Sequence, residues 1–320
     1  MNIAQGLLPV FFALAVGYGA GRLRIVDNQH VGGLNTIVMT IALPIALFSI
    51  LAGAERADVV EHGAVAGVIL LVMAIVYGGV YLLQRFSYKA GPAAAAVQAL
   101  TVAFPNTAAV GLPIAGAVLG RTGELAVAVS LAVGGITLSP LTIAVLNRDQ
   151  PARSAADGSQ KGGRHRPSRS VAFTRALASP VVIAPILGIS WCLAGIPFPS
   201  LLNATLSEIG GVTAGLALFV TGLVLSAQHL ALTGEVVVST LIADLVRPAL
   251  ALLAIRLIGL TGPMAAEVLV LMAVPSGFFG LLLALSHNLT VRAPGPTLFY
   301  STVLSIATLA GVILALPYIA

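Results

Sequence analysis

Charged residues and cysteine are both scarce in this chain of 320 residues. Charged side chains make up 8% of it, against about 25% in typical soluble domains, whereas apolar residues make up 58% and the mean hydropathy is +1.03. The single cysteine, Cys192, excludes an intrachain disulfide and a cysteine-rich metal site, and no spacing of His and Glu indicates a metal either. The composition therefore indicates an integral membrane protein without a metal or other cofactor.

Ten apolar segments, each close to the roughly 20 residues that span a bilayer, follow one another along the chain. The first has no charged start, so we expect a retained helix and not a cleaved signal peptide. An Arg-, Ser-, Gly- and Pro-rich stretch at 147–175 separates the fifth segment from the sixth and predicts a flexible loop. The sequence thus predicts an all-α polytopic membrane protein with ten transmembrane helices, at 3–22, 33–53, 63–84, 92–119, 123–146, 177–195, 200–227, 234–258, 263–287 and 296–318.

The positions of Lys and Arg predict the orientation in the membrane. If the 147–175 stretch is cytoplasmic, twelve of the 16 Lys and Arg residues lie on the cytoplasmic side, and only Arg56, Arg121 and Arg256 lie outside. Both termini are then extracytoplasmic, and we expect a multi-pass protein of the cell inner (plasma) membrane. The basic run at 161–169 suits anionic lipid heads, whereas its lack of aromatic residues argues against nucleic-acid binding.

The two halves of the chain match each other at a nearly constant spacing. The matches include Pro9 with Pro180, Ala46-Leu47-Phe48 with Ala217-Leu218-Phe219 and Gly63 with Gly234, all 171 residues apart, and Pro105 with Pro275, 170 apart. Each half, 1–146 and 177–320, holds five apolar segments, so the second copy enters the membrane in the opposite direction. A basic cytoplasmic loop at 147–176 joins the halves. Such a 5+5 inverted repeat is typical of secondary transporters.

Two corresponding segments, the fourth and the ninth, are interrupted by a proline. They read Phe104-Pro105-Asn106-Thr107 and Val274-Pro275-Ser276-Gly277. Proline breaks a helix, and in lipid the freed backbone groups must be satisfied by protein or by a water-filled cavity. Paired breaks of this kind point to a transporter's binding site, and the N–H groups of a half-helix attract an anion. The alternative is a proline kink whose polar neighbours only cap the freed carbonyls.

The candidate substrate-binding residues follow from these breaks. The Asn106 amide and the Thr107 hydroxyl are donors that suit a carboxylate. Ser276 and Gly277 are the corresponding pair in the ninth segment, where small residues also serve helix packing. Phe278 is suited to cover an apolar part of a substrate, or else faces lipid or a neighbouring helix.

Asp244 and Arg247 lie deep in the eighth segment at a spacing of i, i+3, which places them on one helical face. Each charge in a bilayer centre costs at least about 2.5–3.5 kcal/mol, so such residues face the protein interior. Two interpretations stay open: a structural ion pair, or a proton-coupling carboxylate whose arginine neighbour supports it or contacts substrate. His62, in contrast, is expected in a solvated loop.

Several motifs together resemble the auxin efflux carrier family, over essentially the whole chain except the 147–175 stretch. They are Leu34-Asn35 with Ala42-Leu43-Pro44 and Leu47-Phe48, Phe104-Pro105-Asn106-Thr107 with Gly111-Leu112-Pro113, Ser179-Pro180-Val181-Val182, and Ala273-Val274-Pro275-Ser276-Gly277. The resemblance implies a fold related to the bile acid:sodium symporters. Helices 1, 2, 6 and 7 are then a scaffold, and helices 3–5 and 8–10 a moving unit in which helices 4 and 9 cross at their prolines.

The resemblance also implies a substrate class and further roles. Members of the family carry organic anions, which are auxin in plants and carboxylates such as malonate or malate in bacteria. Asn35 is similar to an asparagine of the family's scaffold, where it either bonds across helices or lines the substrate path. A homodimer is expected by the same analogy.

The expected function is secondary active transport of small organic anions by an elevator-type movement, coupled to H+ or Na+ or to neither. The chain has no Gly-x-x-x-x-Gly-Lys-Ser/Thr motif, which argues against ATP as the energy source. One alternative is a sodium-coupled symporter of the bile-acid type. The other is an intramembrane enzyme, but Asp244 has no evident second carboxylate as a catalytic partner, so we expect no enzyme.

Overall fold

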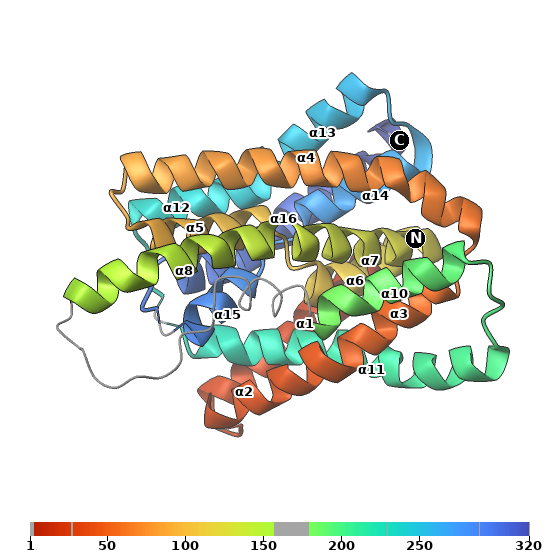
Figure 1. Cartoon of the computed structure of the whole chain (residues 1–320), viewed down its shortest axis with the longest axis horizontal. Coiled ribbons are helices and arrows are strands. Elements are labelled where there is room, and N and C mark those ends of the chain that lie inside the picture. Colours follow the sequence, from red (N-terminus) through yellow and green to blue (C-terminus); the bar gives the residue numbers. More distant parts are fainter. Residues whose placement is uncertain (1–2, 27, 157–178, 229, 288, 320) are drawn as a thin grey trace.

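The computed structural model describes residues 3–26, 28–156, 179–228, 230–287 and 289–319, and all regular structure in these ranges is helical (Figure 1). Segments long and apolar enough to cross a membrane are Gly32–Ala52, Arg56–Phe86, Arg121–Asp149, Ser200–Ser226, Gly234–Ile258 and Pro294–Ile319. Shorter apolar helices of 10–17 residues lie before and between them, and the chain is therefore a multi-pass membrane protein.

The helices follow one another in the order of the predicted segments, and several segments are divided in two. In chain order they are α1 (Ile3–Arg22), α2 (Asn28–Ile37), η1 (Val38–Ala42), α3 (Leu43–Ala52), α4 (Arg56–Phe86), α5 (Pro92–Ala103), η2 (Thr107–Gly111), α6 (Leu112–Leu119), α7 (Arg121–Ile136), α8 (Leu138–Ala156), α10 (Pro180–Leu193), α11 (Ser200–Ser226), α12 (Gly234–Leu241), η3 (Ile242–Val246), α13 (Arg247–Ile258), α14 (Gly262–Ala273), α15 (Phe279–Ser286) and α16 (Pro294–Ile319).

The three η elements are wide π-helical turns, and each has the same local cause. Pro44, Pro113 and Pro248 each stand one residue after the start of the next helix. Proline lacks an N–H and its ring presses on the carbonyl four residues back, so the turn before it opens to bonds that span five residues. The N–H of Leu43 accordingly reaches the Val38 carbonyl, and that of Arg247 reaches the Ile242 carbonyl.

The helices form two groups by their contacts. The first, here called the α11 group, contains α1, α2, η1, α3, α10 and α11, with its most extensive contacts between α1 and α11 and between α3 and α10. The second, the α4 group, contains α4–α8 and α12–α16, linked by contacts such as α4 with α5 and α14 with α16. Figure 1 shows α2, α3 and α11 along one edge of the molecule and α4 along the opposite edge.

Glycines allow α1 and α11 to approach each other closely. A Cβ atom on Gly17 would lie 2.1 Å from the Phe219 carbonyl oxygen, and one on Gly222 would lie 2.2 Å from the Leu14 carbonyl oxygen. Backbones at such a distance leave no room for a larger residue, and small residues at helix contacts are typical of membrane proteins. The α11 group is therefore joined tightly along its longest helix pair.

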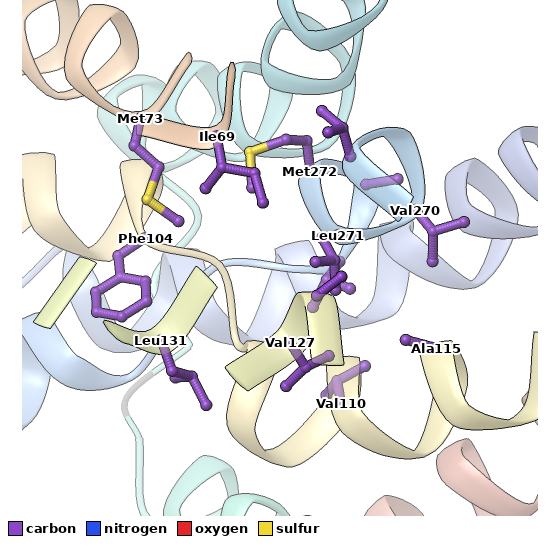
Figure 2. Close-up of a cluster of buried hydrophobic side chains, with 14 of the residues drawn as sticks. Ile69, Met73, Phe104, Val110, Ala115, Val127, Leu131, Val270, Leu271 and Met272 are labelled. Carbon is purple, nitrogen blue, oxygen red and sulfur yellow. The ribbon is translucent and has the colours of Figure 1, made fainter. Parts of the chain in front are cut away.

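The core of the α4 group lies where α4, α5, α7 and α14 meet, around Ile69, Met73, Phe104, Leu131 and Met272 (Figure 2). In the figure, Ile69 and Met73 of α4 point into the cluster that contains Phe104 and Met272. All of these side chains are at most 1% exposed. The chain segment that carries Phe104 is thus held in place by tight packing on α4 and α7.

One predicted boundary is wrong. A loop was expected from residue 147, but α8 remains helical to Ala156. The residues after the apolar part include Arg148, Gln150 and Ala152, which are good helix formers, so the helix continues beyond the apolar stretch. The rest of the predicted loop, including the basic run at 161–169, lies at 157–178, outside the described residues.

Candidate functional site

The two proline breaks lie against each other. Phe104 and Val274, the residues that precede the prolines, are both extended, because proline disfavours a helical residue before it. The two extended stretches pair as an antiparallel bridge between Pro105 and Ser276, and the Asn106 N–H donates to the Pro275 carbonyl at 2.9 Å. We call this region, residues 104–107 and 274–277, the crossover.

Gly277 is required at the crossover for steric reasons. A Cβ atom at this position would lie 2.0 Å from the Phe104 carbonyl oxygen. The Gly277 N–H donates to the Thr101 carbonyl at 3.0 Å, which ties the second break to the helix that ends at the first. Gly277 therefore has the role that small residues have at other helix contacts in membranes, which is to let two backbones approach closely.

Asn106 caps the helix after the break and also has a free donor. Its Oδ1 accepts from the Ala109 N–H at 3.4 Å, which is a capping contact for η2. Its Nδ2 is buried and has no hydrogen-bond partner among the residues that the structure describes, and the same holds for the Ser276 Oγ. Thr107 Oγ1 makes a long contact of 3.5 Å to the Pro105 carbonyl. Unpaired buried polar groups are costly, so the crossover has capacity for an added acceptor.

Arg247 holds the ends of both broken helices. Its side chain is fully buried, and its Nε donates to the Met272 carbonyl at 2.9 Å and its Nη1 to the Val102 carbonyl at 2.6 Å. Its Nη2 donates to the Val274 carbonyl. Val102 and Met272 lie in the last turns of α5 and α14, and Val274 directly follows α14, where a helix leaves its C=O groups without partners. Arg247 thus satisfies main-chain acceptors that the two breaks expose.

Asp244 reaches the crossover through a serine. Its Oδ1 accepts a hydrogen bond from Ser301 Oγ at 2.9 Å. Ser301 Oγ in turn accepts from the Ser276 N–H at 2.8 Å. Asp244 and Arg247 form no direct ion pair among the described residues. The physical reason is η3, because its wide turn changes the rotation per residue and separates side chains that the i, i+3 spacing of an α-helix would align.

Two cavities lie between the α11 group and the α4 group. The Asn35 cavity has a volume of about 460 Å³ and is lined by Asn35 and Thr40 of the α11 group and by Phe104, Ser139 and Phe279 of the α4 group, among others. The Ser49 cavity, about 400 Å³, is lined by residues that include Ser49, Ser207, Gly211, Pro113 and Glu124.

A contact of small apolar residues lies between the two cavities. It consists of Val38, Ala109, Ala217 and Val220, all at most 3% exposed, and we call it the Ala109 contact. Along α11, the Ser49 cavity touches the stretch from 207 to 214 and the Ala109 contact involves 217 and 220. A narrow gap lined by Asn35, Thr221 and Phe278 comes next. The Ala109 contact therefore closes the space between the two helix groups.

The predicted site residues divide into a buried and an accessible set. Asn106, Thr107 and Ser276 are at most 1% exposed and line none of these cavities. Asn35 lines the larger one, where an aromatic stack forms part of the wall. In that stack the ring centroids of Phe104 and Phe279 are 4.9 Å apart, and those of Phe278 and Phe279 are 5.3 Å apart.

The expectation for His62 is wrong, and its partner was not foreseen. His62 lies within α4, is 5% exposed, and its Nε2 is 3.1 Å from Glu267 Oε2 of α14. Hydropathy placed the start of this helix at residue 63, whereas α4 begins at Arg56. Ser301 was also missed, because one serine in a long apolar segment carries no signal until the packing places it beside Asp244.

A helical chain with several membrane-spanning segments and two crossing broken helices has the arrangement of a membrane transporter. The family comparison agrees: residues 2–313 match the model of the membrane transport protein family. The chain belongs to this auxin efflux carrier-like family, which confirms the resemblance that its motifs carry.

The chain is similar to several transporters over nearly its whole length. It is 28% identical to the uncharacterized transporter YfdV of Escherichia coli K12 over 297 residues, which are 89% of this chain and 88% of that protein. It is 25% identical to the uncharacterized transporter MJ1031 of Methanocaldococcus jannaschii over 95% of this chain and 96% of that one. It is also 25% identical to a Rhizobium meliloti protein named "Putative malonate transporter", over 96% of this chain and 93% of that one.

Proposed function

We propose that this protein is a secondary active transporter of small organic anions, with the substrate carboxylate bound at the crossover. The observation that carries the proposal is the pair of unpartnered buried groups there, Asn106 Nδ2 and Ser276 Oγ, on two chain segments that pair directly. A carboxylate oxygen accepts from such donors, and charge-assisted hydrogen bonds of this kind are stronger than neutral ones. The main-chain N–H groups at the start of η2 already have acceptors, since Thr107 donates to the Pro105 carbonyl and Ala109 to Asn106 Oδ1, so the side-chain donors carry the proposal.

The architecture behind this function is a 5+5 inverted repeat of ten transmembrane helices, in which the first half extends through α8 to Ala156 and a cytoplasmic basic stretch leads to the second half. The α11 group is the scaffold and the α4 group is the moving unit. The contacts support this division, because each group is more extensively connected within itself than to the other. Both termini are then extracytoplasmic, in the inner membrane, and a homodimer forms through the scaffold.

Transport takes place when the moving unit slides along the scaffold. Two features support the sliding: the cavities on either side of the Ala109 contact, and the small residues that form this contact. Small side chains let two backbones pass closely. In the described conformation the crossover is adjacent to the Asn35 cavity through Phe104 and Phe279, so a substrate enters or leaves on that side.

The substrate class follows from the chemistry of the crossover and its surroundings. Donors at Asn106 and Thr107 suit a carboxylate, while Phe278 and Phe279 cover an apolar part. Asn35 stands on the scaffold side of the same cavity. The name of the Rhizobium meliloti relative includes malonate, which supports carboxylates as the first compounds to test.

Proton coupling is favoured over sodium coupling by one observation. Asp244 Oδ2 is a buried carboxylate oxygen without a hydrogen-bond partner in the described part of the chain, and Ser301 links its carboxylate to Ser276 of the crossover. A carboxylate at membrane depth is the usual proton carrier of a transporter. The sodium-coupled alternative needs free oxygen ligands at the broken helices, and Arg247 bonds to three of them. An enzymatic function has no such support, and we propose none.

Reconstituted protein tests the proposal. Purified protein in liposomes should take up a radiolabelled carboxylate, such as malonate, malate or indole acetate, faster than protein-free liposomes. The same compound should raise the melting temperature of the protein in detergent in a concentration-dependent way. A matched panel of amines and sugars is the control. If the mono- and dicarboxylates give neither uptake nor a thermal shift, whereas the amines or sugars do, the protein is not an anion transporter.

A further inference from the structure

The guanidinium of Arg247 lies where the electrostatic potential of the backbone is negative. Two helices, α5 and α14, end beside it, and each helix C-terminus has the character of a partial negative charge. Carbonyls of Val102, Met272 and Val274 converge on its three nitrogen atoms from these ends. The side chain is fully buried, so these oxygens replace its water shell. The arrangement is a cation surrounded by main-chain oxygens at the point where two broken helices cross.

In secondary transporters, carbonyls at the ends of discontinuous helices are the groups that coordinate coupling cations such as Na+. We propose that Arg247 is a built-in cation that occupies this position permanently, so that the carrier binds no Na+ at the crossover carbonyls. This inference refines the proposed function and depends on it in one respect, which is that the crossover is the transport site. Arg247 is thus a positioning residue, which fixes both breaks through their backbone.

Only one half of the chain supplies this cation. At the spacing of 171 residues that relates the two halves, Asp244 corresponds to Met73 and Arg247 to Val76, both buried and apolar. A single arginine therefore serves the ends of both broken helices, because it reaches Val102 in one half and Met272 and Val274 in the other. Asp244, bound through Ser301 to the second break, supplies the nearby negative charge.

Removing the guanidinium should leave a latent cation site. In Arg247→Ala, the three carbonyl oxygens would line the vacated space, and oxygen ligands of this kind suit a monovalent cation. We expect Arg247→Ala to have a lower melting temperature than the parent in choline chloride. Adding millimolar guanidinium, or replacing choline chloride with NaCl at equal ionic strength, should raise the melting temperature of Arg247→Ala by several degrees. The parent should show the same melting temperature in NaCl and in choline chloride.

Two further variants separate charge from packing. Arg247→Met fills much of the same volume without a charge and leaves too little space for a cation, so neither cation should stabilise it. Arg247→Lys keeps a cation near the carbonyls, so its melting temperature should not respond to Na+.

The proposal is overturned if Na+ stabilises the parent or Arg247→Lys over choline. A folded Arg247→Ala that responds to neither cation would overturn it as well. If Arg247→Ala does not fold, the NaCl and choline comparison on the parent and on Arg247→Lys still decides. No substrate enters these measurements, so a failure to find anion transport would leave their result unaffected.

Discussion

The backbone of Pro105 pairs with that of Ser276, and this one antiparallel bridge brings together two breaks that lie in different halves of the chain. Proline causes each break, but neither break could exist alone in a membrane, because the freed backbone groups would have no partner. Here the two breaks satisfy each other in part: Asn106 donates to Pro275, and Gly277 donates to Thr101. The crossover is therefore a structural unit, and two of its buried side-chain atoms, Asn106 Nδ2 and Ser276 Oγ, have no hydrogen-bond partner among the described residues.

Asn106 should be essential for anion binding but not for folding. We expect Asn106→Ala to weaken carboxylate binding by about ten- to a hundredfold, because a hydrogen bond to a charged group contributes about 1.5–3 kcal/mol. Thr107→Val should have a smaller effect. The measurement is the dissociation constant from thermal shift, together with uptake into liposomes.

Asn106→Asp is the matched control for this prediction. It keeps an oxygen that can cap the Ala109 N–H but loses the Nδ2 donor and adds a repelling charge. The buried charge should lower the melting temperature, and the protein that folds should fail to bind the anion. If Asn106→Ala binds and transports as well as the parent, Asn106 is only a helix cap and the anion site lies elsewhere.

Gly277→Ala should disrupt the crossover. The new methyl group would lie 2.0 Å from the Phe104 carbonyl oxygen, so the two extended stretches could not pair. We expect loss of uptake and a clearly lower melting temperature. The control is Gly311→Ala in α16, where a Cβ atom meets nothing within 4 Å. That change should be neutral or stabilise the helix by up to about 1 kcal/mol. Equal melting temperatures for the two variants would refute the steric role of Gly277.

Asp244→Asn should separate coupling from structure. Asparagine keeps an oxygen that can accept from Ser301 but cannot carry a proton, so we expect a folded protein whose uptake no longer responds to a pH gradient. Ser301→Ala, which keeps the carboxylate and removes its donor, should retain this response. Uptake into liposomes with and without an imposed gradient, along with melting temperature, tests both variants. A stable Asp244→Asn protein with unchanged pH dependence would exclude Asp244 as the proton carrier.

Cysteine labelling at two positions tests the proposed topology. In a Cys192→Ser background, a cysteine at Ser154 should react with a membrane-impermeant maleimide only after the cells are opened. A cysteine added after Ala320 should react in intact cells. The basis is the asymmetry of Lys and Arg along the chain. Labelling of both positions in intact cells would place them on one side and rule out two oppositely inserted halves of five helices.

The sequence by itself determined the class of protein and the places where its helices break. Low charge and long apolar segments require a membrane environment, and a continuous apolar segment of about 20 residues spans it as a helix. Pro105 and Pro275 break their helices for local reasons, so the breaks were predictable from two residues and their neighbours. The family motifs were equally a property of the chain alone, and the family match confirms them.

Only the tertiary structure decided how the polar residues are used. Arg247 bonds to carbonyls, and since every residue has a carbonyl, no sequence pattern distinguishes Val102, Met272 and Val274 as its partners. The i, i+3 spacing of Asp244 and Arg247 predicted alignment on an α-helix, but the wide turn at η3 separates the two side chains. His62 and Glu267 meet only because α4 packs on α14. Contacts between distant segments depend on the packing of whole helices, and that packing carries the information that local patterns lack.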